Sequence, residues 1–434
     1  MSAPDLAETL AAIVGHEHVV REGAELSTAA IDGILPRWRV RPGSVDEVSR
    51  VMALAGSEGL AVAPRGSGSA LDLGMPPARV DIALDLTRLT GIMEYVPADM
   101  VATVQAGVRL DVLARELGKH RQMLPLDPYG GASRTVGGVL ASGASGPRRF
   151  RYGTGRDLLL GARFVQADGT VTWAGAKVVK SVTGYEIPKL LVGSLGTLGI
   201  IVETTLRLHP AQPATGSWLF SFPSRDHGAV FVAAVLASDL EPERVAWLNG
   251  AALVRTGRES SEAAVAVSVA SVPEAVASQG AALATLAGSA DGRASTLDDE
   301  FWPGLTAALD APIVVRLAGE IRRVSHWAGE LQKLCARHGL TAAVIGEAGN
   351  GVLRAGVQGR VLSQDWAREV VSPLREGLSS EGGSLVVERA PVELKHAADV
   401  WGPVPEPALT VMKRLKAEFD PRGILNRGRF AGGL

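Results

Sequence analysis

The chain has 434 residues, a formal net charge of −2, 46% hydrophobic residues and 21% charged residues. The length predicts two or three domains, and the hydrophobic content supplies a sizeable core and argues against disorder. The near-zero charge argues against a nucleic-acid-binding surface, which would carry a basic excess. The single cysteine, Cys335, excludes a disulfide framework and any cysteine-rich iron–sulfur or zinc site within the chain.

The beginning of the sequence and its apolar runs indicate a protein without a membrane span. The first residues, MSAPDLAETLAAIV, carry acidic side chains and lack the basic end and long apolar core of a signal peptide. The longest purely apolar run, 230–237, is too short to cross a bilayer. We therefore expect a cytoplasmic protein that reaches a membrane, if at all, through partner subunits.

The first half of the chain alternates short apolar runs with helix-like segments. Ser44 precedes one such segment and Glu47 follows three residues later, the pairing of a capping box. With the apolar runs on either side, this predicts a strand–helix–strand unit at 38–64. The other expected elements are a helix at 7–14, strands at 80–86, 91–96 and 101–106, a helix at 108–118, and strands at 158–166, 170–174 and 200–209.

Two glycine-rich stretches stand out in this half. Residues 64–70, PRGSGSA, follow an expected strand, where a glycine loop can direct several amides at a phosphate; a tight turn is the alternative. The loop is not a Rossmann fingerprint, because Leu71 stands where the third glycine belongs. Residues 134–153 are also rich in glycine, which is costly to order. We expect this stretch to be bare backbone against which a large, flat, phosphate-bearing cofactor lies.

From residue 212 onward, strands and helices alternate in a new pattern. The expected strands are 218–222, 244–249, 263–270, 313–317, 342–345, 352–357 and 384–388, with helices at 228–238, 273–287, 324–338 and 365–379. This order predicts a doubled split-βαβ domain, an antiparallel sheet with helices on one face. An amphipathic helix at 403–419 and the segment DPRGILNRGRF follow.

Four motifs in this order resemble the vanillyl-alcohol-oxidase family of FAD-binding (PCMH-type) flavoproteins. They are PRGSGS at 64–69, TVGGVLASGASG at 135–146, GSLGTLGII at 193–201 and DPRGILNRGRF at 420–430. The resemblance covers nearly the whole chain and implies an α+β fold, a two-part FAD-binding domain with a cap domain over the flavin. The implied division is an N-terminal helical segment at 1–33, the FAD-binding domain at 34–211, subdivided near 90, the cap at 212–390, and a C-terminal segment at 391–434 that returns to the FAD domain.

The resemblance also assigns cofactor contacts. The amides of residues 65–69 would hold the pyrophosphate, the glycines of 137–153 would line the flavin and ribityl chain, residues 199–201 would meet the adenosine end, and Asn426 would lie beside the isoalloxazine. The expected FAD-binding residues are Arg65, Gly66, Ser67, Gly68, Ser69, Asp127, Pro128, Thr135, Gly137, Gly138, Ala141, Ser142, Gly143, Gly146, Gly153, Gly199, Ile200, Ile201 and Asn426.

Within this family, three segments resemble the E subunits of bacterial glycolate oxidases. They begin at Leu140, Lys177 and Trp401. The resemblance implies an FAD subunit that oxidises a 2-hydroxyacid, glycolate or D-lactate, to the 2-oxoacid in glyoxylate metabolism, and passes electrons to a second flavoprotein subunit and an iron–sulfur subunit. A stand-alone FAD-dependent oxidoreductase acting on an alcohol, hydroxyacid or lactone, and a non-catalytic flavin-binding or electron-relay subunit, remain alternatives.

We expect the FAD to be bound non-covalently. Histidine or cysteine often forms the covalent flavin bond in this family, but residues 64–74 and 130–155 contain no histidine. Cys335 falls in the expected helix 324–338, where a buried packing role is the ordinary interpretation.

The segment at 346–354 departs from the resemblance. Related 2-hydroxyacid dehydrogenases carry a Gly-His-x-Gly-x-Gly-x-x-His segment whose histidines bind a divalent metal, whereas Glu347 and Arg354 stand at both histidine positions here. A carboxylate beside a guanidinium indicates an ion pair, so we expect no metal. The candidate catalytic residues are Glu347, Arg354, Glu388 and Arg389, with Lys395 a further candidate facing the flavin; a salt-bridged cap interior is the alternative.

Arg148, Arg149 and Arg151 form a small basic cluster next to the glycine stretch. Such a cluster could steer an anionic substrate, contact a partner subunit, or be an ordinary solvated face.

Overall fold

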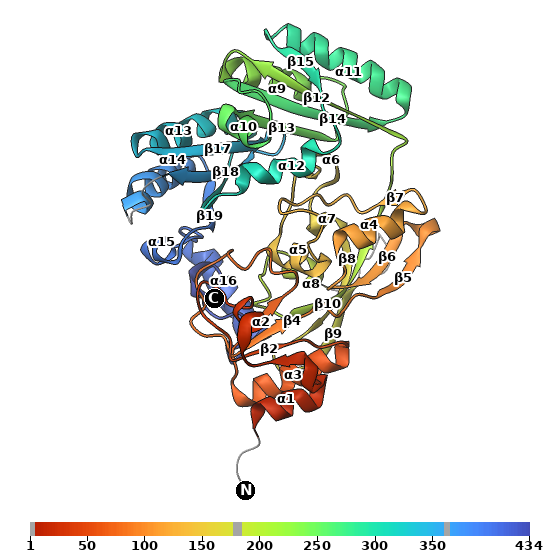
Figure 1. Ribbon diagram of the computed structural model, residues 1–434, viewed down its shortest axis with the longest axis vertical. Helices are drawn as coiled ribbons and strands as arrows, with labels where there is room; N and C mark the ends of the chain where they lie inside the picture. Colours follow the sequence, from red (N-terminus) through yellow and green to blue (C-terminus); the bar gives the residue numbers. More distant parts are fainter. Residues whose placement is uncertain (1–4, 177–184, 360–364) are drawn as a thin grey trace.

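The computed structural model describes residues 5–176, 185–359 and 365–434. The chain forms two parts stacked along its long axis (Figure 1). The lower part contains residues 5–210 and the C-terminal residues from 391, and the upper part contains residues 214–389. None of the helices in these described ranges has the length and apolar character needed to cross a membrane.

The first sheet of the lower part has the strand order β1-β2-β4-β3. Its strands are β1 (Val19–Val20), β2 (Trp38–Val40), β4 (Ile82–Asp85) and β3 (Val62–Arg65), with β2, β4 and β3 parallel. Helices α1 (Leu6–Val14) and α3 (Val45–Glu58) share an apolar core with it. Ser44 caps α3 by accepting from the Glu47 amide at 3.1 Å, which confirms the predicted helix start. Since β1 pairs with β2, the N-terminal segment contributes one strand to this sheet.

The second sheet is antiparallel, with the order β5-β6-β10-β8-β9. Its strands are β5 (Ile92–Val96), β6 (Val101–Gln105), β10 (Ile200–Arg207), β8 (Leu159–Val165) and β9 (Val171–Gly175). The central strand β10 is buried over all but its last residue and packs with α4 (Leu110–Gly118) in one core. The remaining short elements of this part are η1 (His16–His18), α2 (Gly23–Ser27), η2 (Pro97–Asp99), α8 (Ile187–Leu191) and the two paired strands β7 (Gln122–Met123) and β11 (His209–Pro210).

Part of the glycine stretch, which we expected to be bare backbone, is helical. It forms α5 (Val136–Ser142), α6 (Arg149–Tyr152) and then α7 (Gly155–Leu158). Thr135 caps α5 by accepting from the Gly138 amide. Gly137 lets this helix lie directly on the second sheet, because a Cβ there would be 2.6 Å from the Ala106 Cβ. The glycines therefore serve close packing of a short helix as well as an open surface.

The upper part is one eight-stranded antiparallel sheet with the order β15-β12-β14-β13-β17-β18-β16-β19. The strands are β12 (Ala214–Phe222), β13 (Arg244–Asn249), β14 (Ala263–Ser271), β15 (Arg293–Thr296), β16 (Ile313–Ala318), β17 (Leu340–Glu347), β18 (Val352–Gly359) and β19 (Ser384–Arg389). Long helices cover one face: α9 (Arg225–Ala237), α11 (Pro273–Gly288), α13 (Val324–Arg337), η5 (Ala367–Val371) and α14 (Ser372–Ser380). The other face carries α10 (Gly250–Arg255), α12 (Phe301–Gly304) and η3 (Leu305–Leu309). We expected helices on one face only, but they lie on both.

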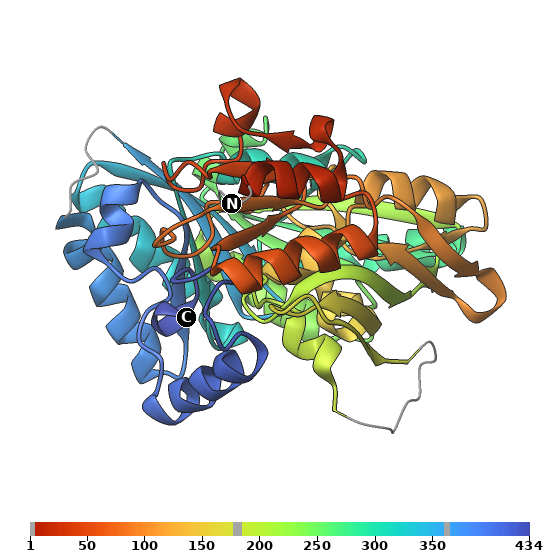
Figure 2. The same cartoon turned by 90° about the horizontal axis from the view of Figure 1, so that it is seen from below.

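The C-terminal residues return to the lower part. After α15 (Val392–Ala397) and α16 (Glu406–Phe419), Leu425 forms a parallel bridge with Val62 beside β3. The Lys416 ammonium holds this return by bonding Asp420, the Thr197 carbonyl and the Leu425 carbonyl. Figure 2 shows the blue C-terminal segment running back beside the red and orange N-terminal half. The C-terminal segment and the N-terminal half of the chain therefore belong to the same lower part.

Candidate functional site

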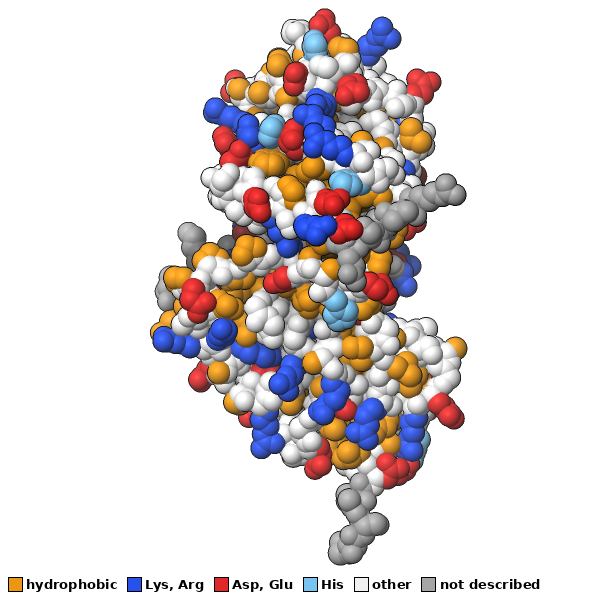
Figure 3. All heavy atoms as spheres, turned by 90° about the vertical axis from the view of Figure 1, so that its left-hand side faces the viewer, with side chains coloured by type: hydrophobic (Ala, Val, Ile, Leu, Met, Phe, Trp, Pro, Cys, Tyr) orange, Lys and Arg blue, Asp and Glu red, His pale blue; other side chains and the backbone are white. Residues whose placement is uncertain are grey.

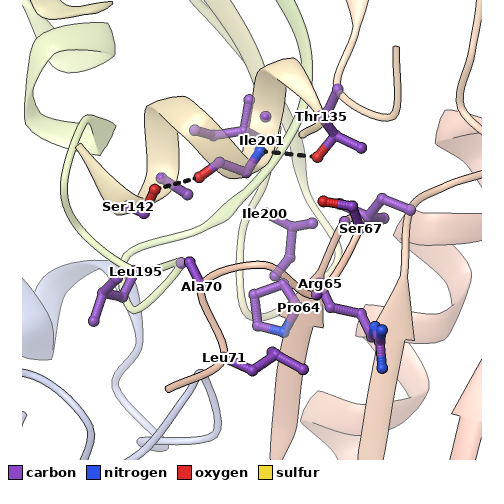
Figure 4. A pocket seen from close by; sticks show the side chains of 18 of the residues that line it. Pro64, Arg65, Ser67, Ala70, Leu71, Thr135, Ser142, Leu195, Ile200 and Ile201 are labelled. Atoms are coloured by element: carbon purple, nitrogen blue, oxygen red, sulfur yellow. Dashed lines mark hydrogen bonds between the residues drawn. The ribbon is translucent and has the colours of Figure 1, made fainter. Parts of the chain in front are cut away.

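A cavity lies where the loop after β3, helix α5, residues 195–201 and the C-terminal turn meet (Figure 4). Fourteen of the residues expected to bind FAD line it: Arg65, Gly66, Ser67, Gly68, Ser69, Thr135, Gly137, Gly138, Ala141, Ser142, Gly199, Ile200, Ile201 and Asn426. These residues come from four segments far apart in the sequence, which the fold brings together around one space.

The loop after β3 faces the cavity with its backbone. The Arg65 guanidinium turns away toward the first sheet, donating to the Thr28 carbonyl at 2.8 Å, and burial lowers its pKa. At Gly66 a Cβ would lie 2.0 Å from the Thr135 Oγ1, and Gly68 has a φ of +84° that favours glycine. Bare amides at such a loop suit the phosphates of a dinucleotide.

Asn426 closes the cavity from the C-terminal side. It adopts a φ of +45°, and its Nδ2 donates to the Leu195 carbonyl at 2.6 Å. Its Oδ1 is buried with no hydrogen-bond partner among the described residues, although buried polar atoms are normally paired. An unpaired acceptor on this wall fits a cofactor that donates a hydrogen bond there.

Four expected cofactor residues lie outside this cavity and outside the second cavity described below: Asp127, Pro128, Gly146 and Gly153. Asp127 accepts from the Arg148 amide at 3.0 and 3.1 Å and from the Arg244 Nε at 3.1 Å. Burial raises the pKa of Asp127 to about 6, with Arg244 and Arg148 opposing this rise. Gly146 packs against the same residue, since a Cβ there would lie 1.8 Å from the Asp127 carbonyl oxygen. Asp127 thus joins the two parts.

The basic cluster of the sequence belongs to the same junction. The Arg148 Nε lies 3.0 Å from Glu243, and Arg151 pairs with Glu241 at 3.1 Å, both acidic residues being in the upper part. These two arginines therefore form contacts within the chain. The face shown in Figure 3 narrows at this level and carries interspersed acidic and basic side chains.

A second cavity of about 530 Å³ lies between the lower and upper parts. It shares Ser69, Ala70 and Ser142 with the first cavity, and the expected Gly143 also lines it. Its upper wall is the face of β16 and β18 that the long helices leave open, where residues 314, 316 and 354 alternate with core residues.

Four charged side chains form a network on this wall. The Arg354 Nη1 lies 2.5 Å from the Glu347 Oε1, and its Nε lies 3.1 Å from the Glu388 Oε2. Arg316 stands directly opposite Arg354 in the strand register, and its Nε lies 3.2 Å from the Glu388 Oε1. Glu388 therefore bridges two arginines that would otherwise repel each other.

The electrostatics of the network follow from its burial. Burial acts to lower the pKa of Arg354, but Glu388 and Glu347 outweigh it and raise the pKa above the ordinary value. Burial raises the pKa of Glu347, against the effect of Arg354. The Tyr129 ring centroid lies 5.2 Å from the Arg354 Cζ, and burial raises the pKa of its phenol. Arg354 is thus a permanent cation at this wall.

The structure brings together three of the four expected catalytic residues: Glu347, Arg354 and Glu388. Arg389 lies at the rim of the cavity, where its Nε donates to Asp72 at 3.1 Å. The expectation for Lys395 is wrong: its side chain is fully buried against Asp32 and does not line the cavity.

Sequence reasoning missed three cavity residues: Arg316, Arg134 and Tyr129. Arg316 is the lone charge in the apolar strand IVVRLA, a signal that could have found it. Arg134 donates to the Tyr129 carbonyl and to Ser142, and burial lowers its pKa to about 10.

The residues at 347, 354 and 388 do not fit the divalent metal that the resemblance associates with this position. A zinc ligand set needs three or more nitrogen, sulfur or oxygen donors about 2 Å from the ion. Here two carboxylates are paired with a guanidinium, and no group of three or more His, Cys, Asp or Glu residues within the described ranges could hold a metal.

Two family models match this chain. Residues 36–175 match the FAD binding domain, and residues 395–430 match the C-terminal domain of FAD linked oxidases. The chain is therefore a flavoprotein of the FAD-linked oxidoreductase class, with FAD as its cofactor. Both matched segments line the first cavity, through residues such as Gly66 and Asn426.

Solved structures share the fold of the chain. It is similar to p-cresol methylhydroxylase with a TM-score of 0.78 and 16% identity, covering 98% of this chain and 95% of the other. It is similar to alkyldihydroxyacetonephosphate synthase with a TM-score of 0.76 and 17% identity, covering 99% and 86%. The chain thus has the fold of these proteins, and the predicted α+β fold is confirmed.

Curated relatives extend over the same length. Glycolate oxidase subunit GlcD of Bacillus subtilis is 26% identical, covering 99% of this chain and 97% of that protein. D-lactate dehydrogenase of Archaeoglobus fulgidus is 28% identical, covering 90% of each. The glycolate oxidase relative is a D subunit, so the assignment of this chain to the E subunits stays a prediction.

Proposed function

We propose that this chain is an FAD-dependent oxidoreductase that converts a 2-hydroxyacid, such as glycolate or D-lactate, to the 2-oxoacid. The observation that carries the proposal is a cavity suited to the cofactor that shares the lining residues Ser69, Ala70 and Ser142 with a second cavity lined by arginines. The relatives named glycolate oxidase and D-lactate dehydrogenase support the same class of substrate.

The residues of the second cavity suit an α-hydroxycarboxylate. Arg316 is 32% exposed, it lines the cavity, and its two Nη atoms have no hydrogen-bond partner among the described residues. A free guanidinium fork binds a carboxylate with two parallel hydrogen bonds. We therefore assign the substrate carboxylate to Arg316.

Glu388 is the proton acceptor in this proposal. Its carboxylate lines the cavity and contacts both arginines, so a proton taken from the substrate hydroxyl leaves the network with one more net positive charge. When bound, FAD supplies the acceptor for the two electrons that leave the substrate carbon. The part of the chain's own residues is to hold the carboxylate, orient the hydroxyl and remove its proton.

The bound FAD is non-covalent in this proposal. No histidine lines the cofactor cavity among the described residues, and Cys335 is buried in α13 of the upper part. Acid precipitation should therefore release the yellow colour into the supernatant, and colour retained in the pellet would contradict this.

A second candidate is a flavin-binding relay subunit that does not oxidise substrate itself. The cavity-lining Glu388 and the buried Glu347 behind it are both already paired with Arg354, which favours a role as structural counter-ions. In either role, we propose that electrons pass to partners of the glycolate-oxidase type, a second flavoprotein subunit and an iron–sulfur subunit, on a complex located in the cytoplasm or at the membrane through those partners.

The test uses the purified, FAD-loaded chain without partners. Under anaerobic conditions, glycolate or D-lactate should bleach the flavin absorbance if the chain oxidises its substrate. Arg316→Met should abolish bleaching at unchanged FAD content, whereas Arg337→Met, at an exposed arginine ending α13, should leave it unchanged. Absence of bleaching by any 2-hydroxyacid, with bleaching restored by a partner, would favour the relay subunit.

A further inference from the structure

Arg354 stands at one of the two positions where related proteins have a metal-binding histidine. We infer that Arg354 acts as a built-in cation that contacts and polarises the substrate, so that this chain binds its hydroxyacid without a divalent metal. The inference rests on the proposed function, since it concerns the ligand of the same cavity.

Arg354 is fixed in place more firmly than a surface arginine. It lies in the middle of β18, between β17 and β16, and only 7% of its side chain is exposed. Its Nη1 and Nε are held by Glu347 and Glu388 on the two sides, and the ring of Tyr129 lies over the guanidinium. A guanidinium held in this way is pre-organised and costs little further ordering when a ligand binds.

One side of this guanidinium remains available. The Nη2 atom of Arg354 has no hydrogen-bond partner among the described residues, and the residue lines the cavity. Two further polar atoms of cavity-lining residues are buried without partners in the part of the chain that the structure describes, the Tyr129 hydroxyl and the Arg134 Nε. The Oε2 of Glu347, the partner of Arg354, is also buried and unpaired there. Buried polar atoms left unpaired mark a place where a polar ligand completes the hydrogen bonding.

The same contacts exclude a metal ion from this wall. The Arg354 Nη1 lies 2.5 Å from the Glu347 Oε1, so Glu347 has only one unpaired oxygen, Oε2, for a cation that needs three or more donors at about 2 Å. Arg316, directly across the strand pair, adds a second positive charge that would repel a divalent ion. The network is neutral as two arginines and two glutamates. Among the residues that line the cavity, the arginines at 134, 316, 354 and 389 outnumber the carboxylates of Asp72, Asp310 and Glu388 by one, which suits one monocarboxylate.

The first experiment is on the wild-type holoprotein. Oxalate, a non-oxidisable analogue, is titrated in while the flavin absorbance spectrum is recorded, before and after dialysis against EDTA, and bound metals are measured by mass spectrometry. We expect the same oxalate affinity in both and less than stoichiometric divalent metal. Stoichiometric metal together with binding lost on chelation would overturn this inference alone. If oxalate, glycolate and D-lactate all leave the spectrum unchanged, the proposed function fails and this inference with it.

The second experiment replaces the cation. Arg354→Met should weaken oxalate binding about 30-fold or more, because a buried charged contact is lost. Arg354→Lys should bind oxalate more tightly than Arg354→Met, since it keeps the charge but loses the fork. The double variant Glu347→Gln with Arg354→Met removes the uncompensated carboxylate, so a folded, FAD-loaded protein remains for the titration if Arg354→Met alone is unstable. Unchanged oxalate affinity in these variants would overturn the inference.

Discussion

Lys395 provides the sharpest test of how the C-terminal segment is held against the rest of the lower part. Its side chain is fully buried, and its Nζ lies 2.7 and 2.9 Å from the two Asp32 oxygens and 2.6 Å from the Asp72 carbonyl. Burial lowers the pKa of this ammonium, and the Asp32 carboxylate opposes that effect. One side chain from α15 thus fixes the N-terminal segment and the loop that lines both cavities.

Replacing Lys395 by Met should cost about 3–5 kcal/mol of unfolding free energy. Removing one partner of a buried ion pair leaves the other charge uncompensated, and only 5% of the Asp32 side chain is exposed. The Asp72 carbonyl also loses its donor. The double variant with Asp32→Asn removes the stranded charge and should regain at least about 2 kcal/mol of this loss.

The assay is urea unfolding of the FAD-loaded protein, followed by tryptophan fluorescence, with the midpoints compared at a common slope. The matched control is Lys413→Met, at an exposed lysine of α16, which should change the unfolding free energy by less than about 0.5 kcal/mol. The reasoning would be refuted if Lys395→Met cost less than about 1 kcal/mol, or if the losses of the two single variants simply added in the double variant.

Three further predictions follow from local geometry. Gly146→Ala should yield little folded, FAD-containing protein in a flavin-content measurement, because its Cβ would lie 1.8 Å from the Asp127 carbonyl oxygen, while Gly118→Ala, with open space around its Cβ, should retain FAD. Burial raises the pKa of Asp127 to about 6, so between the unfolded-state pKa of about 3.9 and this value the native state binds one proton more than the unfolded state. Urea unfolding should therefore show the unfolding free energy falling by up to about 3 kcal/mol as pH rises from about 4 to about 6. Asp127→Asn should remove this pH dependence. Cys335 is buried and burial raises its thiol pKa to about 12, so a thiol reagent should label it only after unfolding, and rapid labelling of the native protein would be inconsistent with this burial.

Patterns along the chain predicted most of the elements because they depend on local signals. Strand β13 was expected at 244–249 and is Arg244–Asn249, and the Ser44 cap begins α3 as predicted. The helices within the glycine stretch were not predicted, since its glycines suggested only bare backbone. Thr135 supplies a cap, and close packing on Ala106 selects small residues in the helix that follows. The spacing of glycines along the sequence does not show whether they serve close packing of a helix or an open surface for a ligand.

The residues of the site also divide into those that a local motif marks and those that only the fold reveals. The loop at 65–69 and Asn426 were found because a motif in the sequence marks them, and the cofactor cavity collects them. Arg316 was missed because its role depends on its place opposite Arg354, and strand order in a sheet of eight strands is not a local property. Lys395 was misplaced for a related reason: its partner Asp32 is 363 residues away, and nothing near it in sequence indicates that it is paired.

The arrangement of the arginines on the cavity wall explains why this wall suits an anionic ligand. Arg316 and Arg354 stand directly opposite each other, which is unfavourable for a strand pair. The pairing of β16 with β19 shifts between Val314 and Val315, and Glu388 lies at this irregularity, where its carboxylate contacts both guanidiniums. One carboxylate shared by two arginines leaves donors unpaired on the side that faces the cavity. A carboxylate bound at this wall would accept hydrogen bonds from the unpaired arginine donors. It would therefore also stabilise the folded chain, by an amount that increases with its affinity.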